Sequence, residues 1–280
     1  MKVIQLNEYV KLHDGEKIFF CKWGHPGYLD QAFEDIKRKQ HDVVLIIGGS
    51  DVCVGNHQLN NLPKNVSKVF VQNCHIEKDD CGGLIVPIPR GVEVSEAVRH
   101  HSHIYAWCGS EIEGEEKRKV LSNPPKKDPT KFVYANFRVN TNSSHRQSVM
   151  SIVQNASHIT WREPYGTTDR QRFLNGPPYI DFVHDILDHE AVICAQGNDW
   201  GGNLRMYETL YLSRVALTFN PKMYNNLHYL LPVALVEDLE ELKNYEFLKE
   251  KISLAKIKFK TGRHLLDFNY WKNLILKAAS

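Results

Sequence analysis

One stretch of the chain, residues 191–219, carries a complete unit of a parallel sheet: AVICAQGNDWGGNLRMYETLYLSRVALTF. An apolar run at 191–195 enters a polar loop with three glycines, a helical pattern covers 205–213, and a second apolar run follows at 215–219. A buried strand, a helix and a second buried strand in this order are typical of α/β proteins. The glycines allow the loop to turn sharply and to approach a ligand closely.

The same alternation of short apolar runs with helical patterns extends over the rest of the chain. It predicts an α/β fold built on parallel sheets. Strands are predicted at 17–22, 43–48, 68–73, 84–89, 132–137, 158–161, 191–195, 215–219 and 231–236. Helices are predicted at 28–40, 144–155, 178–189 and 205–213, and amphipathic helices at 240–259 and 265–278.

A proline- and lysine-rich stretch, residues 113–131, separates the two series of strands and is interpreted as a linker. We therefore expect two Rossmann-like domains of similar size, at 1–125 and 126–262. The C-terminal helix in 263–280 is expected to cross back onto the first domain. A single sheet of nine strands is the alternative. A chain of 280 residues is long enough for two domains that each bury a core.

Composition limits the class of protein. The chain has 35 lysines and arginines against 33 acidic residues, a balance that argues against a nucleic-acid-binding protein. The polar start lacks the apolar core of a signal peptide, and no run of about 18 apolar residues predicts a membrane span. The six cysteines form no CxxC pair and are interpreted as reduced, mostly buried thiols. We expect a soluble, cytoplasmic protein.

The loop at 196–203 lies where α/β sheets bind ligands, beyond the carboxyl end of a strand. A helix that begins near Asn203 points free N–H groups at the loop, which favours a phosphate. Arg205 adds a bidentate donor for phosphate oxygens. Glu208 shares its helix face and has acceptors for ribose hydroxyls. The alternative is a glycine-rich turn in which Arg205 and Glu208 form only a solvated ion pair.

The wider context of this loop resembles the C-terminal signature of exostosin-like glycosyltransferases. The matching features are an apolar strand, a loop with Gly197, R-x-x-E at Arg205 and Glu208, the run VALTF, and a Pro-Val strand at 232–233 before an acidic helix start. The resemblance covers about residues 131–245. Gly202 and Leu239 depart from the pattern, and both departures bear on the donor sugar.

The resemblance implies a GT-B architecture, with two facing domains and the nucleotide sugar on the second. It implies an inverting, metal-independent transferase that moves a sugar from UDP to a hydroxyl of an oligosaccharide or glycoprotein glycan. The compact size resembles soluble exostosin-type enzymes of large algal viruses, so xylose is the first expectation for the sugar. A UDP-hexose or UDP-glucuronic acid transferase, or a non-catalytic nucleotide- or glycan-binding module, remains the alternative.

Further residues are candidates for the donor site. Arg138 and Arg146, in or beside the loop after the strand at 132–137, would offset charge on the leaving UDP, with Ser144 capping the next helix. They could equally be surface arginines around a capped helix.

Trp161 and Arg162 are candidates for the wall of a uracil pocket, although a buried structural Trp161 is as good an interpretation. Around the glycine-rich loop, Gln196, Asn198 and Asp199 are expected to bind hydroxyls of the donor sugar.

An inverting transfer needs a base for the proton of the acceptor hydroxyl. Asp51, just past the buried strand at 43–48, is the first candidate and His57 the second. Asp51 could instead only cap the next turn. No metal site is expected, because His100, His101 and His103 lack further ligands at metal-binding spacing.

Overall fold

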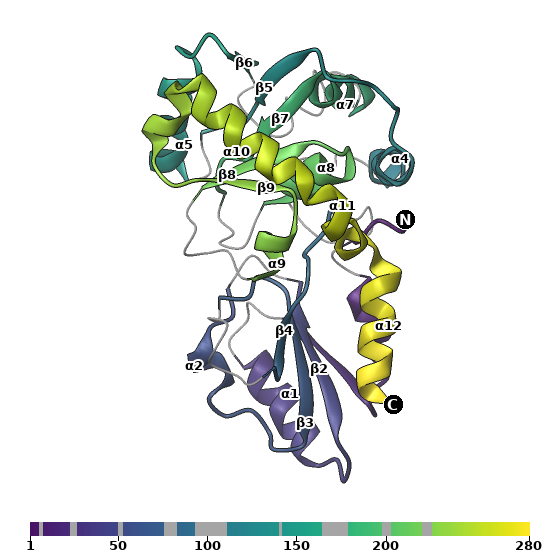
Figure 1. Ribbon diagram of the computed structural model, residues 1–280. Helices are drawn as coiled ribbons and strands as arrows, with labels where there is room; N and C mark the ends of the chain where they lie inside the picture. The colour runs from purple at the N-terminus through teal and green to yellow at the C-terminus, as the bar shows by residue number, and fades with distance from the viewer. Residues whose placement is uncertain are drawn as a thin grey trace.

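The computed structural model contains two separate parallel sheets, one in the upper half and one in the lower half of Figure 1. This confirms the predicted α/β fold class and rules out the single nine-stranded sheet. The residues described are 1–5, 8–22, 27–49, 53–75, 83–92, 111–139, 142–163, 179–197, 203–219 and 226–280.

The first sheet has the order β1-β2-β3-β4, and all its strands are parallel. β2 is buried along its whole length, as a strand covered on both faces must be. Helix α1 presents buried Leu29, Phe33 and Ile36 to one face of the sheet, and α12 contacts β2 and β3. The elements are η1 (Tyr9–Leu12), β1 (Ile18–Lys22), α1 (Tyr28–Lys37), β2 (Val43–Gly48), α2 (Asn56–Leu59), β3 (Val66–Val71), β4 (Ile85–Pro87) and α12 (Phe268–Ala279).

The second sheet has the order β6-β5-β7-β8-β9, again all parallel. Helices α5 and α10 bury apolar residues against one face, and α7 and α8 against the other. The elements are β5 (Lys131–Ala135), α5 (Ser143–Val153), β6 (Ile159–Trp161), α7 (Tyr179–Leu187), β7 (His189–Ile193), α8 (Leu204–Tyr211), β8 (Val215–Phe219), α9 (Asn226–Leu230), β9 (Val233–Val236), η4 (Leu239–Lys243), α10 (Tyr245–Ile257), α11 (Phe259–Gly262) and η5 (Arg263–Leu266).

Two details differ from the sequence predictions. The interpretation of 113–131 as a linker is wrong in its first half, because α4 (Glu111–Ser122) forms there and contacts α7 and α8. Proline disfavours a helix at the residue before it, so the Pro124-Pro125 pair ends the helix instead of marking a fully extended linker. Ser144 does not cap α5, since the N-cap is Asn142 in a left-handed conformation.

Strand ends also shift in a consistent way. β3, β4, β5 and β7 each end two residues earlier than predicted, although the two residues that follow each strand are still buried. After β7, Cys194 and Ala195 remain buried while the chain leaves the ladder. The predicted strands are therefore too long because buried residues continue past the end of each strand.

Helix α8 joins the two halves of the molecule. Its residues 206–211 are all buried. The hydroxyl of Tyr207 accepts a hydrogen bond from the Arg90 backbone N–H at 3.1 Å. The Tyr211 hydroxyl accepts one from the Ile4 N–H at 2.8 Å and donates to the Leu266 carbonyl at 2.9 Å. Apolar residues of both sheets form one continuous core around these contacts.

The N-terminal segment is held closely at the same junction. Its Ile4 carbonyl accepts a hydrogen bond from the Val92 N–H at 2.9 Å, and its Lys2 carbonyl accepts one from the Phe268 N–H. Gly91 has a φ of +79°, and a Cβ there would lie 2.3 Å from the Ile4 oxygen. A glycine is thus needed for both conformation and space.

Two sequence expectations concern cysteines and membranes. Among the described cysteines, Cys21, Cys74 and Cys194 are buried and Cys53 is half-buried, and Cys21 and Cys194 are free thiols. None of the helices within the described ranges is both long and apolar enough to cross a lipid bilayer.

Replacing Tyr211 with Phe tests the junction. The change leaves the buried Ile4 N–H and Leu266 carbonyl without their partner, so we expect the free energy of unfolding to fall by about 1–3 kcal/mol. Urea denaturation measures it. Tyr229→Phe, at a side chain 49% exposed, is the control and should change stability by less than about 0.5 kcal/mol. Equal stability of the two variants would contradict the assignment.

Gly91→Ala and Gly83→Ala form a second matched pair, because both glycines have a φ of +79° but Gly83 has nothing within 4 Å of an added Cβ. The conformational cost of about 1–2 kcal/mol is common to both. Only Gly91→Ala also forces the Ile4 backbone away, which adds about 1–3 kcal/mol. Thermal denaturation of both variants measures the difference in stability. Similar losses of stability would show that the close approach of Gly91 to Ile4 is unimportant.

Candidate functional site

The strand order of the second sheet reverses between β5 and β7. The chain leaves β5 towards α5 on one face and leaves β7 towards α8 on the other. Loops that diverge in this way open a crevice at the carboxyl ends of the two strands, where α/β proteins bind ligands. The loop singled out in the sequence follows β7 and therefore borders this crevice.

Arg146, in the first turns of α5, ties the two loops together. Its Nε donates to the Gln196 carbonyl at 2.9 Å and its Nη1 to the Arg138 carbonyl at 2.8 Å. Nη2 donates more weakly to the Ala195 carbonyl at 3.4 Å. Asn142 adds a contact to the Gly197 carbonyl at 3.4 Å. Arg146 thus holds the backbone on both sides of the crevice.

Asn203 begins α8, as the sequence predicted. Its side-chain oxygen accepts a hydrogen bond from the Met206 N–H at 2.9 Å, which is an N-cap. Its side-chain nitrogen donates to the Ala195 carbonyl at 2.7 Å. The Asn203 side chain is therefore committed to fixing the start of α8 against the end of β7.

Arg205 and Glu208 form the i,i+3 ion pair of the alternative interpretation, at 3.1 Å, but the pair is not solvated. Glu208 is only 4% exposed, and its second oxygen lies 2.5 Å from the ammonium of buried Lys117 on α4. The Arg205 guanidinium stacks 4.0 Å from the ring of Phe182. Two cations thus balance one buried carboxylate, as burial of a charge requires.

Arg138 and His145 lie beside the switch point, in the loop after β5 and in the first turn of α5. Arg138 is partly buried, and desolvation lowers its pKa. The His145 ring lies edge-on to Phe219 at 4.9 Å, and burial together with the nearby Arg146 lowers its pKa. Arg146 and Arg205 add two further guanidinium groups, at the starts of α5 and α8.

Trp161 is the last residue of the edge strand β6 and Arg162 follows it, on the side of β5 away from β7. The indole of Trp161 packs edge-on against Phe137, 5.2 Å away, and its N–H donates to Glu163. Arg162 forms an ion pair with Asp185 of α7. Both residues adjoin the end of β5, and their predicted contact with a uracil ring stays a prediction.

The predicted acceptor side lies on the first sheet. His57 is exposed on the short helix α2, with its Nε2 at 2.7 Å from the Gln58 amide nitrogen. Gln72 connects the loops after β2 and β4, because its amide accepts from the Gly49 N–H and donates to the Pro89 carbonyl. Asp51, Asn198 and Asp199 lie outside the described residues, as do the three histidines at 100–103.

Two of the residues that shape the site were missed in the sequence. Lys117 lies in a highly charged stretch, where a buried lysine is not expected. Its one signal is Leu121, four residues later on the same helix face and fully buried. Asn142 gave no signal, since its left-handed conformation depends on the loop. No cluster of three or more potential metal ligands occurs among the residues that the structure describes.

Comparison with known proteins adds no functional assignment. No family model matches the sequence, and no curated protein matches it. Among solved structures, the chain is similar to one in the crystal structure of accessory secretory proteins 1, 2 and 3 of Streptococcus pneumoniae, at 10% identity and a TM-score of 0.42. The similarity covers 98% of this chain and 56% of that one. It is too distant to support a statement about function.

The buried ion pair gives a direct stability test. Lys117→Met removes one of the two cations around Glu208, so we expect the free energy of unfolding to fall by about 3–5 kcal/mol. The exposed neighbour Lys119→Met serves as the control. Adding Glu208→Gln to Lys117→Met removes the uncompensated charge and should restore part of the loss. Denaturant titration of all three variants measures their free energies of unfolding. Equal stability of Lys117→Met and Lys119→Met would contradict a role of Lys117 in balancing Glu208.

Proposed function

We propose that the protein is an inverting, metal-independent glycosyltransferase of GT-B architecture that moves a sugar from UDP to a glycan hydroxyl. The observation that supports this best is the placement of three arginines beside the switch point of the second sheet: Arg138 follows β5, Arg146 lies in the first turn of α5, and Arg205 lies in the first turn of α8. The exostosin-like pattern in residues 131–245 supports the same activity. Xylose is the first candidate for the sugar, and a hexose or glucuronic acid the alternative.

Within this proposal the three arginines have different tasks. Three N–H groups of Arg146 are directed at backbone carbonyls, so we assign Arg146 to positioning the loops. Arg138 and Arg205 are the candidates for contact with the diphosphate. The N-terminus of α8 would add its dipole to the same anion.

The contacts of Glu208 favour a role through Arg205. A carboxylate has about four acceptor positions, so the predicted bond to the ribose remains possible beside its two cations. Its burial makes the orientation of Arg205 the better-supported task. Gln196, Gly197, Asn198 and Asp199 remain the candidates for hydroxyls of the donor sugar.

The reaction follows from a single displacement at the anomeric carbon. The acceptor oxygen forms a bond to that carbon from the face opposite UDP, and the bond from carbon to the UDP oxygen breaks. UDP leaves as an anion, whose added charge Arg138 and Arg205 would stabilise. The proton of the acceptor hydroxyl passes to a base on the first sheet, for which Asp51 and His57 are the candidates.

Thermal denaturation with nucleotides tests the donor site. We expect UDP and UDP-xylose to raise the melting temperature without added metal and GDP to have little effect, because ligands that bind the folded state stabilise it by mass action. Arg138→Lys keeps the charge but loses the bidentate geometry, so the UDP shift should largely disappear. Arg205→Ala should abolish it as well. The exposed Arg263→Ala should keep the full shift.

Release of UDP from UDP-xylose in the same samples separates a transferase from a binding protein. Slow hydrolysis by the unmodified protein, lost in Arg138→Lys, supports catalysis. Binding without any turnover, with or without a glycan acceptor, would instead favour a nucleotide-binding module. No response to any uridine nucleotide would overturn the proposal.

A further inference from the structure

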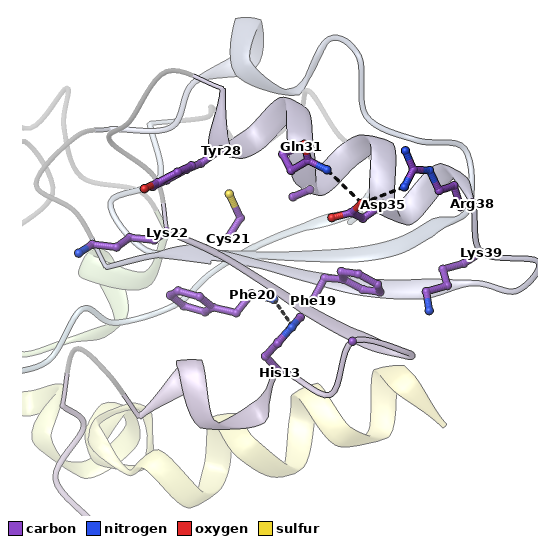
Figure 2. A pocket seen from close by; sticks show the side chains of 12 residues that line it. His13, Phe19, Phe20, Cys21, Lys22, Tyr28, Gln31, Asp35, Arg38 and Lys39 are labelled. Atoms are coloured by element: carbon purple, nitrogen blue, oxygen red, sulfur yellow. Dashed lines mark hydrogen bonds and ion pairs between the residues drawn. The ribbon is translucent and has the colours of Figure 1, made fainter.

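A hollow of about 630 Å³ lies along the free edge of β1, on the first sheet and away from the crevice described above (Figure 2). Its volume is within the range of ligand pockets in proteins. Its lining comes from α1 and from β1 and the turn at 13–15, and Figure 2 shows Cys21 on the α1 side of the strand and Phe20 and His13 on the opposite side.

The α1 wall presents planar polar groups in a row. Tyr28, Gln31, Asp35 and Arg38 follow one another at helical spacing and therefore share a face of α1. The Gln31 amide donates to Asp35 at 3.1 Å, and Arg38 lies 3.6 Å from the same carboxylate. Tyr28, 52% exposed, stands at the end of this row. The row thus combines an aromatic ring with amide, carboxylate and guanidinium groups.

The β1 side of the hollow is apolar. Phe19 and Cys21 face α1 and are only 7% and 3% exposed, whereas Phe20 lies on the opposite face of the strand and is half-buried. Burial raises the pKa of Cys21 to about 11, so this thiol stays neutral. The aromatic rings of Tyr28 and Phe20, beside the hydrogen-bonding groups of α1, fit a ligand with both apolar and polar faces. Sugar rings have this character, because their C–H groups pack on aromatic rings while their hydroxyls donate and accept hydrogen bonds.

Charge along α1 and the adjoining rim is largely cancelled, and Lys22 adds a cation at the end near Gly49. Arg38 is paired with Asp35, and Lys39 lies 2.9 Å from Glu16 at the rim. A phosphate or a strongly acidic ligand would have to compete with these carboxylates. Along α1, this pairing favours a neutral, hydroxyl-rich ligand.

The free edge of β1 is closed to another strand. Asp14 accepts a hydrogen bond from the Ile18 N–H at 2.8 Å and donates its own N–H to the Ile18 carbonyl at 3.1 Å. The Phe20 N–H donates to His13 Nδ1 at 3.1 Å. Because these backbone groups are already occupied, an added peptide strand does not fit this edge.

One end of the hollow reaches the predicted acceptor loop. Lys22 and Phe20 lie beside Gly49, where a Cβ would be 3.4 Å from the Lys22 Cγ and 3.6 Å from the Phe20 ring. Gly49 follows β2 and begins the loop that holds Asp51. A chain of sugars seated in the hollow would thus extend towards the carboxyl edge of the first sheet.

We propose that this hollow binds a neutral oligosaccharide, as the seat for the part of the acceptor glycan that does not react. This rests on the proposed function, since it names a site for the acceptor of that same reaction. Tyr28 is the stacking platform, and Gln31 and Asp35 bind hydroxyls. Acceptor length then becomes a determinant of binding, because sugars beyond the reacting residue make contacts on α1.

Titration of the full chain with xylotetraose, cellotetraose, maltotetraose and N-acetylchitotetraose, followed by saturation-transfer NMR and calorimetry, tests the inference. We expect at least one of these neutral tetrasaccharides to bind. Tyr28→Ala and Gln31→Ala should each weaken that binding, with Tyr28→Ala reducing the affinity about fivefold or more. Tyr270→Ala, at a 38% exposed tyrosine on α12, is the matched control and should bind normally.

The outcomes separate this inference from the proposed function, because UDP-induced stabilisation is measured on the same variants. If UDP stabilises the protein but none of the four tetrasaccharides binds, the hollow is not a glycan site and the transferase proposal stands. The same holds if the Tyr28→Ala variant binds them with unchanged affinity. Preferential binding of an acidic hyaluronan tetrasaccharide would also overturn it. If UDP does not stabilise the protein but a tetrasaccharide binds in a Tyr28-dependent way, only the transferase proposal is contradicted.

Discussion

The burial of α8 is the constraint on which the rest of the molecule depends. A helix with six consecutive buried residues must find partners for its polar side chains on every side. Tyr207 and Tyr211 find them in the backbone of the first half of the chain, and Glu208 finds Lys117 of α4. The same helix begins at the crevice of the second sheet. The junction of the two sheets and the candidate donor site are therefore built on one element.

Most of the fold could be predicted because its signals are local. The nine predicted strands correspond to the nine strands in the part of the chain that the structure describes, and the apolar run at 43–48 is the fully buried β2. The misjudged segment, 113–131, has a composition that suits both a linker and a solvated helix, and its helix depends on contacts with α7 and α8. Strand ends were placed too late because buried residues continue beyond the last ladder hydrogen bond.

In the candidate site, too, features with a local signal could be predicted and features that depend on distant contacts could not. The start of α8 at Asn203 follows from a cap preference that is visible in the sequence. The task of Arg146 does not, because its acceptors Ala195 and Gln196 lie about fifty residues away and are backbone atoms. The ion pair of Arg205 with Glu208 was foreseen as an alternative, but its burial was not, since the second cation comes from α4. Spacing along a helix predicts which side chains are neighbours and leaves their environment open.

The central claim is that the second sheet holds a uridine diphosphate sugar at its switch point, between the loops after β5 and β7. The most direct measurement is a crystal structure of the protein with UDP. The account predicts a diphosphate beside Arg138 and Arg205 at the N-terminus of α8, with Arg146 still bonded to the backbone carbonyls. UDP bound elsewhere, or a crevice left without nucleotide at saturating UDP, would contradict it.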